Sequence, residues 1–261
     1  MRITASFQAE ENIKLPPSYN HLVQSLIYRH IDEKLANFLH KHGFLHGKRA
    51  FKLFTFSRIQ GKVKYLLQDH SFEFTPPLSL IISSPIDGFI ESLAENFVKS
   101  EAIKINAQKL YLESINVHFA PKINSENEIK MLSPVTIYST LSTVNGKKKT
   151  YYYSPFEKEF SQLLEENLKK KYEALYHREI NNLCFSIKPL RVNNSSEKIV
   201  SYKGTVIKGW VGVYKAKGSP ELIKLAYDAG LGAKNSQGFG CFKVISSLEE
   251  KDMILCHRVR L

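Results

Sequence analysis

A glycine-rich stretch near the end of the chain constrains the fold most strongly. Residues 230–240 read Gly-Leu-Gly-Ala-Lys-Asn-Ser-Gln-Gly-Phe-Gly, so glycines stand on both sides of a polar centre. Glycine adopts a positive φ without steric cost and lets another backbone approach closely. Such a loop can expose amide N–H groups, which suit phosphate oxygens. The stretch therefore favours a ligand-binding loop over the alternative, a long flexible turn.

The elements on either side of this loop exclude the common nucleotide-binding fingerprints. Ser219 and Pro220 are typical of a helix start, and apolar residues follow on one face as far as Tyr227. Gly230 suits the C-terminal cap of that helix, and a short strand is expected at 241–246. The loop therefore joins a helix to a strand, whereas the glycines of P-loops and Rossmann folds follow a strand and open a helix.

The charge of the chain indicates a polyanionic partner. Its 261 residues include 37 Lys and Arg against 25 Asp and Glu, which gives a net charge of +12 and a pI near 9.4. This excess favours nucleic acid over a membrane surface as the partner. The alternative is a basic protein without such a partner.

The cysteines and the length of the apolar runs indicate the cellular compartment. The three cysteines, Cys184, Cys241 and Cys256, are far apart and odd in number, so they support neither a disulfide framework nor a zinc site. The start of the chain has no long apolar run, and no uncharged apolar stretch approaches ~18 residues. We therefore expect no signal peptide, no transmembrane helix, no association with a membrane, and a reducing, cytoplasmic location.

The first half of the chain alternates strands and helices. We expect strands at 2–8, 51–57, 63–67, 71–75, 78–82 and 109–119, and helices at 19–38 and 86–99. A loop at 39–49, rich in histidine and positive charge, follows the first helix. The order β-α-β-β-α-β with one extra hairpin is typical of ferredoxin-like folds.

The second half repeats this order without an obvious sequence repeat. We expect strands at 129–140, 151–153, 183–192 and 241–246, a hairpin at 198–214, and helices at 155–179 and 219–229. Asn145-Gly146 predicts a hairpin turn. The prediction is an α+β chain of two tandem ferredoxin-like (RRM-type) domains, at 1–120 and 129–261, joined by a polar linker at 120–128. The second domain carries the glycine-rich loop, and a basic cleft between the sheets would offer a place for RNA.

The residue pattern gives no sign of a metal or of a serine nucleophile. A helical His-x-x-x-His pair, an acidic cluster and paired cysteines are all missing from the sequence. No Gly-x-Ser-x-Gly elbow occurs either. We therefore predict no metal and no cofactor.

Three residues of the first half could act together on RNA. Tyr28 lies on the first helix, His40 near its end and Lys52 in the next strand. A helix, a tight loop and a returning strand could gather them at one end of the sheet. Histidine exchanges protons near neutral pH, lysine stabilises negative charge in a transition state, and a tyrosine hydroxyl orients or protonates. This set suits cleavage of RNA by its own 2′-OH, which leaves a 2′,3′-cyclic phosphate and a 5′-OH.

Each of these residues also has a purely structural interpretation. Tyr28 could be the edge of the apolar stripe of its helix. His40, His42 and His46 could be solvated loop histidines, or His42 or His46 could take the role given to His40. Lys52 could run its aliphatic stem along the strand edge.

Two segments of the chain resemble one family. The stretch 230–240 is similar to the C-terminal glycine-rich motif of the RAMP (repeat-associated mysterious protein) superfamily. The second likeness lies in Leu-Ile-Tyr at 26–28, Phe-Leu-His at 38–40 and Phe-Lys-Leu-Phe-Thr-Phe-Ser at 51–57. With the order of elements, the chain resembles the CRISPR-repeat-processing endoribonucleases of that superfamily (the Cas-six family). The glycine-rich loop alone indicates the superfamily and not the activity, since some members only bind RNA.

The resemblance implies two ferredoxin-like folds and metal-independent cleavage within the repeat of CRISPR precursor RNA, which yields mature guide RNAs. By position, Tyr28, His40 and Lys52 look like the family's Tyr-His-Lys triad. His40 would be the general base or acid, Lys52 would stabilise the scissile phosphate, and Tyr28 would assist.

Charge and loop geometry indicate where RNA would be held. Lys48 and Arg49 flank the expected scissile phosphate, and the lysines at 147–149 precede three tyrosines that could stack on bases. An exposed hairpin tip with solubilising lysines is the alternative there. The predicted RNA-binding residues are Lys48, Arg49, Lys147, Lys148, Lys149, Gly232, Lys234, Ser236, Gln237 and Gly238.

Two functional hypotheses follow. The first is a metal-independent CRISPR RNA endoribonuclease, and the alternative is a non-catalytic CRISPR-RNA-binding subunit of an interference complex. The Tyr-His-Lys set favours the first, because a pure RNA binder does not need it. The expected partners are CRISPR repeat RNA, as precursor and as guide, and proteins of an interference complex. The protein itself would be a monomer or a homodimer.

Overall fold

The central strand of the first sheet is β1 (Arg2–Gln8). In this computed structural model, which describes residues 1–142, 146, 148–180 and 182–245, β1 pairs with β7 (Ser71–Ser83) on one side and with β9 (Gln108–His118) on the other. Both pairings are antiparallel, and alternate apolar residues of β1 are buried, as predicted. The other strands of this sheet are β2 (Ile13–Leu15), β5 (Thr55–Phe56), β6 (Gln60–Leu66) and β8 (Ile103–Ile105).

Helices α1 (Asn20–His30), α2 (Glu33–Lys41) and α3 (Phe89–Lys99) share one hydrophobic core with this sheet. The prediction of one helix over 19–38 is wrong, because the helical conformation is interrupted between α1 and α2. Ile31 is extended, and the Asp32 carboxylate then accepts a hydrogen bond of 2.9 Å from the Leu35 amide. An N-cap of this kind starts a new helix, so the apolar residues that were expected on one helix are divided between two.

The predicted loop at 39–49 and strand at 51–57 also differ from the structure. Residues Phe44–His46 (β3) and Arg49–Phe51 (β4) form a small hairpin instead. Leu53 then has a positive φ of 50°, a conformation that no strand tolerates, so Lys52 lies between two strands rather than within one. The strands expected at 71–75 and 78–82 are a single strand, β7.

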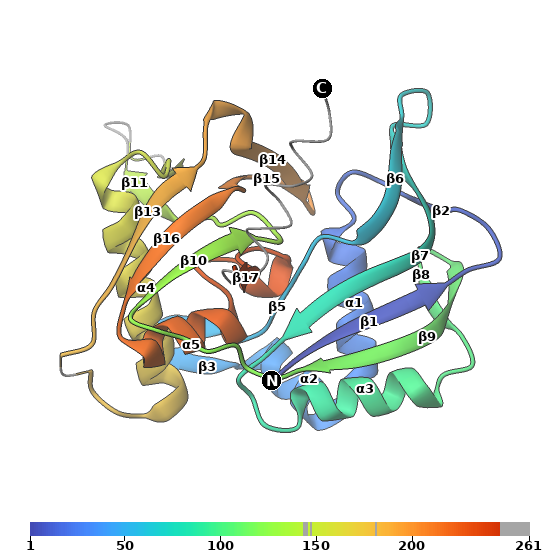
Figure 1. Ribbon diagram of the computed structural model, residues 1–261, viewed down its shortest axis with the longest axis horizontal. Helices are drawn as coiled ribbons and strands as arrows, with labels where there is room; N and C mark the ends of the chain where they lie inside the picture. Colours follow the sequence, from blue (N-terminus) through green and yellow to red (C-terminus); the bar gives the residue numbers. More distant parts are fainter. Residues whose placement is uncertain (143–145, 147, 181, 246–261) are drawn as a thin grey trace.

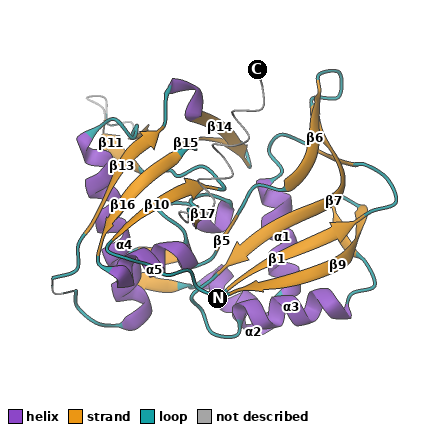
Figure 2. Cartoon of the chain, viewed as in Figure 1, coloured by secondary structure: helices purple, strands orange, loops and turns teal. Residues whose placement is uncertain are grey.

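The second sheet has the ferredoxin-like strand order β13-β16-β10-β17. Its elements are β10 (Glu126–Met131), α4 (Lys158–Tyr176), β13 (Phe185–Arg191), β16 (Val213–Gly218), α5 (Pro220–Ala229) and β17 (Phe242–Val244). Figure 1 shows α4 and α5 packed against this sheet, with which they share a second core. The prediction of two ferredoxin-like folds is confirmed, and Figure 2 shows their two sheets side by side.

Two ribbons extend the second unit. They are β11 (Tyr138–Ser142) with β12 (Lys148–Tyr152), and β14 (Glu197–Tyr202) with β15 (Thr205–Trp210). The strand expected at 129–140 is therefore two strands, and the hairpin expected at 198–214 ends at Trp210. Asn145 of the predicted turn and residues 249–261 lie outside the described residues. We propose that the boundary between the two domains lies in residues 119–125, which join β9 to β10.

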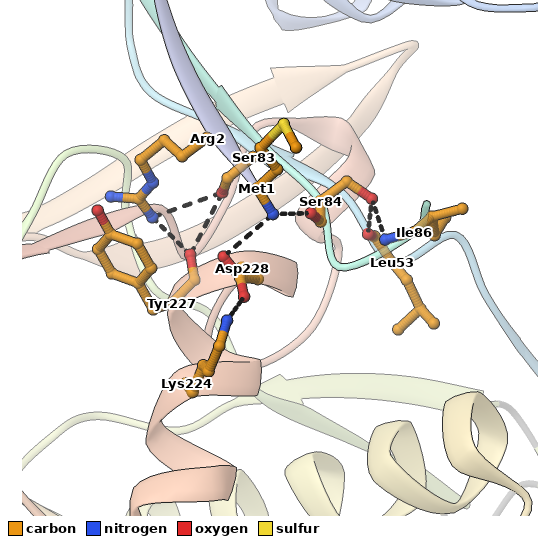
Figure 3. A network of polar contacts seen from close by, with 9 residues as sticks. All are labelled: Met1, Arg2, Leu53, Ser83, Ser84, Ile86, Lys224, Tyr227 and Asp228. Carbon is orange, nitrogen blue, oxygen red and sulfur yellow. Dashed lines mark hydrogen bonds and ion pairs between the residues drawn. The ribbon is translucent and has the colours of Figure 1, made fainter. Parts of the chain in front are cut away.

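A buried arginine joins the two units. The Arg2 guanidinium, 3% exposed, donates hydrogen bonds to the carbonyl oxygens of Phe242 at 2.7 Å and Tyr227 at 2.5 Å. It also lies 3.5 Å from the centre of the Tyr227 ring, and Ser83 donates to the same Tyr227 oxygen (Figure 3). Because Arg2 is on β1 and Tyr227 is on α5, these contacts fix the relative position of the two sheets. Among the described residues, no helix has the length and apolar character needed to cross a membrane.

Candidate active site

Tyr28, His40 and Lys52 come together at the end of α2. The rings of Tyr28 and His40 meet edge to face with centroids 6.4 Å apart, and Lys52 Nζ donates a hydrogen bond of 3.3 Å to the His40 carbonyl oxygen. All three line one cavity of about 440 Å³. The rest of its described lining is His21, Gln24, Ser25, Tyr202, Lys203, Ser236 and Gln237. The triad cavity is therefore built from both units and includes part of the glycine-rich loop.

The local sequence explains how these side chains meet. The break after Ile31 turns α2 back against α1, which brings His40 beside Tyr28. Tyr28 also packs edge to face on the buried ring of Phe54, with centroids 5.6 Å apart. The structural interpretation of Tyr28 as the edge of the core stripe therefore holds, and it does not exclude a place in the cavity.

Burial changes the proton affinities of two of these groups. Desolvation, with a smaller contribution from Tyr202, raises the pKa of Tyr28 to about 12. At neutral pH Tyr28 is therefore a neutral phenol that can donate a hydrogen bond. Partial burial lowers the pKa of Lys52, because it disfavours the charged form. A phosphate beside Lys52 would favour the charged form and offset that desolvation.

The other histidines of this region lie elsewhere. His46 Nε2 is 2.7 Å from Glu173 Oε2 on α4, an ion pair when the imidazole is protonated. His42 is exposed beside Phe38. Neither lines the cavity that holds Tyr28 and Lys52. Among the described residues, no group of three or more His, Cys, Asp or Glu side chains could hold a metal ion.

Several amides of the glycine-rich loop are bonded within the protein, contrary to the expectation that the loop exposes them. The amide of Leu231 donates to Gly240 at 2.9 Å, and that of Ala233 donates to Thr136 at 2.8 Å. The amides of Gly238 and Gly240 are bonded as well, at 2.9 Å each. These amides therefore close the loop on itself and on the chain after β10, and they are not phosphate ligands. The polar side chains between the glycines are a second way for the loop to contact a ligand.

Close packing explains why the loop needs glycine. Gly240 has a φ of 78°, and a Cβ there would lie 2.0 Å from the Leu231 carbonyl oxygen. At Gly232 a Cβ would be 2.4 Å from the Thr136 oxygen, and at Gly238 it would be 2.5 Å from the Phe56 ring. Backbone and rings from both units approach the loop at distances that only glycine permits.

Two buried polar side chains hold the loop, and the sequence analysis missed both roles. Asn235 Nδ2 donates to the carbonyl oxygens of Leu231 and Phe239 at 3.1 and 3.0 Å. Lys171 Nζ, on α4, donates to Gly230 and Gly232 at 2.7 and 2.8 Å. Lys171 falls on the inward stripe of α4 at helical spacing, which was the available signal for its burial.

Further lining residues of the triad cavity were also missed. Gln24 on α1 donates a hydrogen bond of 2.7 Å to the Ser236 carbonyl oxygen and accepts one from Tyr202. Tyr202 and Lys203 end the β14 ribbon and complete the cavity wall. A single sequence could not indicate them, because they meet only when the two units pack together.

The predicted RNA-binding residues fall into three places. Lys234, Ser236 and Gln237 line a second cavity together with Arg49 and Lys52. Lys48 is exposed in the turn between β3 and β4. Lys148 and Lys149 are exposed on β12, far from the triad in the chain, and Lys147 lies outside the described residues.

The expected basic cleft between the sheets is present. A cavity of about 620 Å³ opens between them and is lined by Arg2, His118, Lys130 and Lys243, beside the exposed ring of Phe119. This charge and aromatic surface suit a nucleic-acid strand.

Comparisons with known proteins agree with these features. The description "CRISPR-associated protein Cas6, N-terminal" belongs to a family model that matches residues 14–116, and "CRISPR associated protein Cas6, C-terminal" belongs to one that matches residues 116–244. The "CRISPR-associated endoribonuclease Cas6 1" of Methanocaldococcus jannaschii is 28% identical over 256 residues, which cover 97% of this chain and 94% of the relative. The "CRISPR-associated endoribonuclease Cas6" of Pyrococcus furiosus is 27% identical, with 92% and 87% covered.

Solved structures share the whole fold. The structure described as "An RAMP protein binding different RNA substrates" has a TM-score of 0.78 at 27% identity, and the match covers 94% of this chain and all (100%) of that one. Another, described as "CRISPR associated protein Cas6", has a TM-score of 0.74 at 28% identity, with 94% and 99% covered. Because the two family models together span residues 14–244 and the fold agrees over the same length, the chain belongs to the Cas6 family of CRISPR-associated proteins.

Proposed function

We propose that this protein is an endoribonuclease that cleaves CRISPR precursor RNA within the repeat and so yields mature guide RNAs. The observation that carries the proposal is the meeting of Tyr28, His40 and Lys52 in one cavity, which Lys203 also lines. The names of the Methanocaldococcus and Pyrococcus relatives support the same activity.

The chemistry follows from the three groups. The substrate's 2′-OH attacks the adjacent phosphate, the bond to the 5′-oxygen breaks, and the products carry a 2′,3′-cyclic phosphate and a 5′-OH. His40 removes or delivers a proton, and the Lys52 ammonium stabilises the charge that develops on the phosphate. Tyr28, neutral at physiological pH, donates a hydrogen bond. The nucleophile belongs to the substrate, so we propose that the reaction needs no metal.

The cations around the cavity would hold the RNA backbone. We assign phosphate contacts to Lys48, Arg49 and Lys234, and polar contacts to Ser236 and Gln237. The ribbon of β11 and β12, with Lys148, Lys149 and neighbouring tyrosines, would add charge and stacking, and we assign the same role to Lys147. Gly232 and Gly238 would shape the loop that presents these side chains. Affinity should therefore fall steeply with salt.

The alternative function is a CRISPR-RNA-binding subunit that does not cut. It would use the same basic surfaces without proton transfer, so a cavity with Tyr28, His40 and Lys52 favours the enzyme. We also propose a cytoplasmic location, a monomeric or homodimeric state, and association with proteins of an interference complex that uses the guide RNA.

The proposal is tested by cleavage of the cognate repeat RNA in EDTA. Wild-type protein should cut the RNA, and a 2′-deoxy substitution at the cut site should abolish cutting. His40→Ala should lose activity by at least about a hundredfold, the usual range for a general acid or base, while the control His42→Ala should cut like wild type. If the His40→Ala protein still cuts the RNA, a group other than His40 must transfer the proton. Tight binding by wild-type protein without any cutting would leave only the binding-subunit function.

A further inference from the structure

The second cavity, beside the triad, gathers four cations. It measures about 260 Å³ and lies between α4, the segment after β4 and the glycine-rich loop. Arg49, Lys52, Lys171 and Lys234 all line it, and no carboxylate does so among the described residues. Since a water molecule occupies about 30 Å³ of liquid, the space suits a larger polar group. An anion is the ligand whose charge this lining complements.

Burial disfavours the positive charge of two of these lysines, and an anion in the cavity would compensate for it. Desolvation, with the positive charge of Arg49 as a smaller cause, lowers the pKa of Lys171 to about 7. Burial also lowers the pKa of Lys234. Both ammonium groups are thus held where their charge is disfavoured, and a phosphate in the cavity would stabilise the charged form of each.

Two buried groups in this cavity have unused hydrogen-bonding capacity. An ammonium has three N–H donors. Two of those on Lys171 go to Gly230 and Gly232, and within the described part of the chain the third has no acceptor. Asn167, one helical turn before Lys171 and 3% exposed, has an Oδ1 that is buried without a partner among the described residues. Together they offer a donor to an anion and an acceptor to a hydroxyl.

We propose that this cavity binds the ribose and phosphate of a nucleotide that flanks the cut site. The phosphate oxygens accept from Lys171, Arg49 and Lys234, and the ribose 2′-OH donates to Asn167 Oδ1. A ribonucleotide carries this pair of groups, an anion and a neighbouring hydroxyl that donates.

The position of the cavity fits a strand that passes through the active site. Lys52, Ser236 and Gln237 line both this cavity and the triad cavity. A strand whose scissile phosphate lies at Lys52 can therefore place a neighbouring nucleotide in the second cavity. The assignment rests on the proposed function, and it adds that the protein distinguishes RNA from DNA at a nucleotide that is not cut.

Binding measurements test the hydroxyl contact. The probe is the cognate repeat RNA with a 2′-deoxy nucleotide at the cut site, which prevents cleavage, and with one further 2′-deoxy nucleotide placed in turn at each flanking position. One flanking substitution should weaken wild-type binding by about three- to tenfold, the loss of one hydrogen bond. Asn167→Leu should weaken binding by the same factor and should be insensitive to that substitution. Wild-type affinity in Asn167→Leu, or equal sensitivity of both proteins at every position, would overturn the assignment.

A second variant keeps the test independent of folding. Asn167→Leu should melt no lower than wild type, because it removes an unpartnered buried oxygen. Arg49→Gln changes an exposed side chain at the cavity, and it should lose affinity and become insensitive to a methylphosphonate at the flanking phosphate. The control Lys99→Ala removes one charge from the exposed end of α3. Equal affinities of Arg49→Gln and Lys99→Ala would argue against a phosphate in the cavity.

Cleavage of unmodified RNA separates this inference from the proposed function. If wild-type protein cuts the RNA but neither Asn167→Leu nor Arg49→Gln alters affinity, the cavity assignment is wrong and the endoribonuclease stands. If wild-type protein neither cuts nor binds the repeat, both proposals are wrong.

Discussion

Lys52 Nζ donates a hydrogen bond to the main-chain oxygen of His40 across 3.3 Å. This contact joins the segment between β4 and β5 to the last turn of α2, where carbonyl groups lack helical partners. It holds an ammonium that lines both cavities beside the ring proposed to transfer the proton. The contact therefore links two of the three residues that we propose to act on one phosphate.

Replacement of the Tyr28 hydroxyl should slow cleavage without changing its pH dependence. Burial raises the pKa of Tyr28 to about 12, so the phenol keeps its proton, and its capacity to donate, throughout pH 7–10. Tyr28→Phe should therefore lose roughly ten- to a hundredfold in single-turnover rate, the value of one hydrogen bond to a charged group. The factor should be the same at every pH in this range. The exposed Tyr65→Phe is the control. A difference that disappears towards pH 10 would mean that Tyr28 ionises there.

Two glycines with nearly equal positive φ values should respond differently to alanine. Gly240 and Gly204 have φ values of 78° and 79°, but a Cβ at Gly240 would lie 2.0 Å from the Leu231 oxygen, whereas nothing lies within 4 Å of one at Gly204. Gly204→Ala should cost about 1–2 kcal/mol of unfolding free energy, the penalty of the left-handed conformation. Gly240→Ala should cost about 1–3 kcal/mol more, the typical cost of overpacking a closely packed site. Urea unfolding measures both, and equal losses would show that the loop can open without cost.

Lys171 should make stability depend on pH. Its pKa is about 7 in the folded protein and about 10.4 when unfolded. Between these values the unfolded chain binds more protons, so the free energy of unfolding rises with pH. Lys171→Met removes this effect and leaves Gly230 and Gly232 without their donor. The stability gap between wild type and Lys171→Met should therefore widen by a few kcal/mol from pH 7 to 10.

The neighbouring Lys170 supplies the control for this measurement. Lys170 is partly exposed and lies 4.0 Å from Glu166, an ordinary surface pair. The gap between wild type and Lys170→Met should stay constant over the same pH range. A constant gap for Lys171→Met as well would mean that the lysine is charged in the folded protein at all these pH values.

Most elements of the fold could be predicted from residue periodicity. The strand at 2–8 and the helix at 219–229 follow local rules of alternation and capping, and the structure confirms them. The hairpin expected at 198–214 is also present, with its turn at 203–204 and its end at Trp210. The missed break between α1 and α2 has a local cause, the Asp32 cap, but the apolar stripe continues across it. Periodicity reports which residues face a core, and it does not report whether one helix or two carry them.

The candidate site likewise contains residues that the sequence could identify and residues that it could not. Tyr28, His40 and Lys52 could be chosen from their chemistry and from a family resemblance. Lys171 stands in a run of three lysines that resembles a solvated helix face, and its burial depends on the carbonyl oxygens of a loop about sixty residues away, at positions 230 and 232. A local pattern contains no information about such a distant acceptor.

The sequence by itself determined the class of fold, the basic character of the surface and the place of the glycine-rich loop, because these depend on local periodicity, composition and backbone freedom. Only the tertiary structure decided what the loop does. The amides of Leu231, Ala233, Gly238 and Gly240 bond within the protein, while Lys234, Ser236 and Gln237 line the cavities. The physical reason is that a polar group bonds to whichever partner packing places beside it. Here packing joins the two units through Arg2 and the loop, and it places Lys171 of α4 beside that loop.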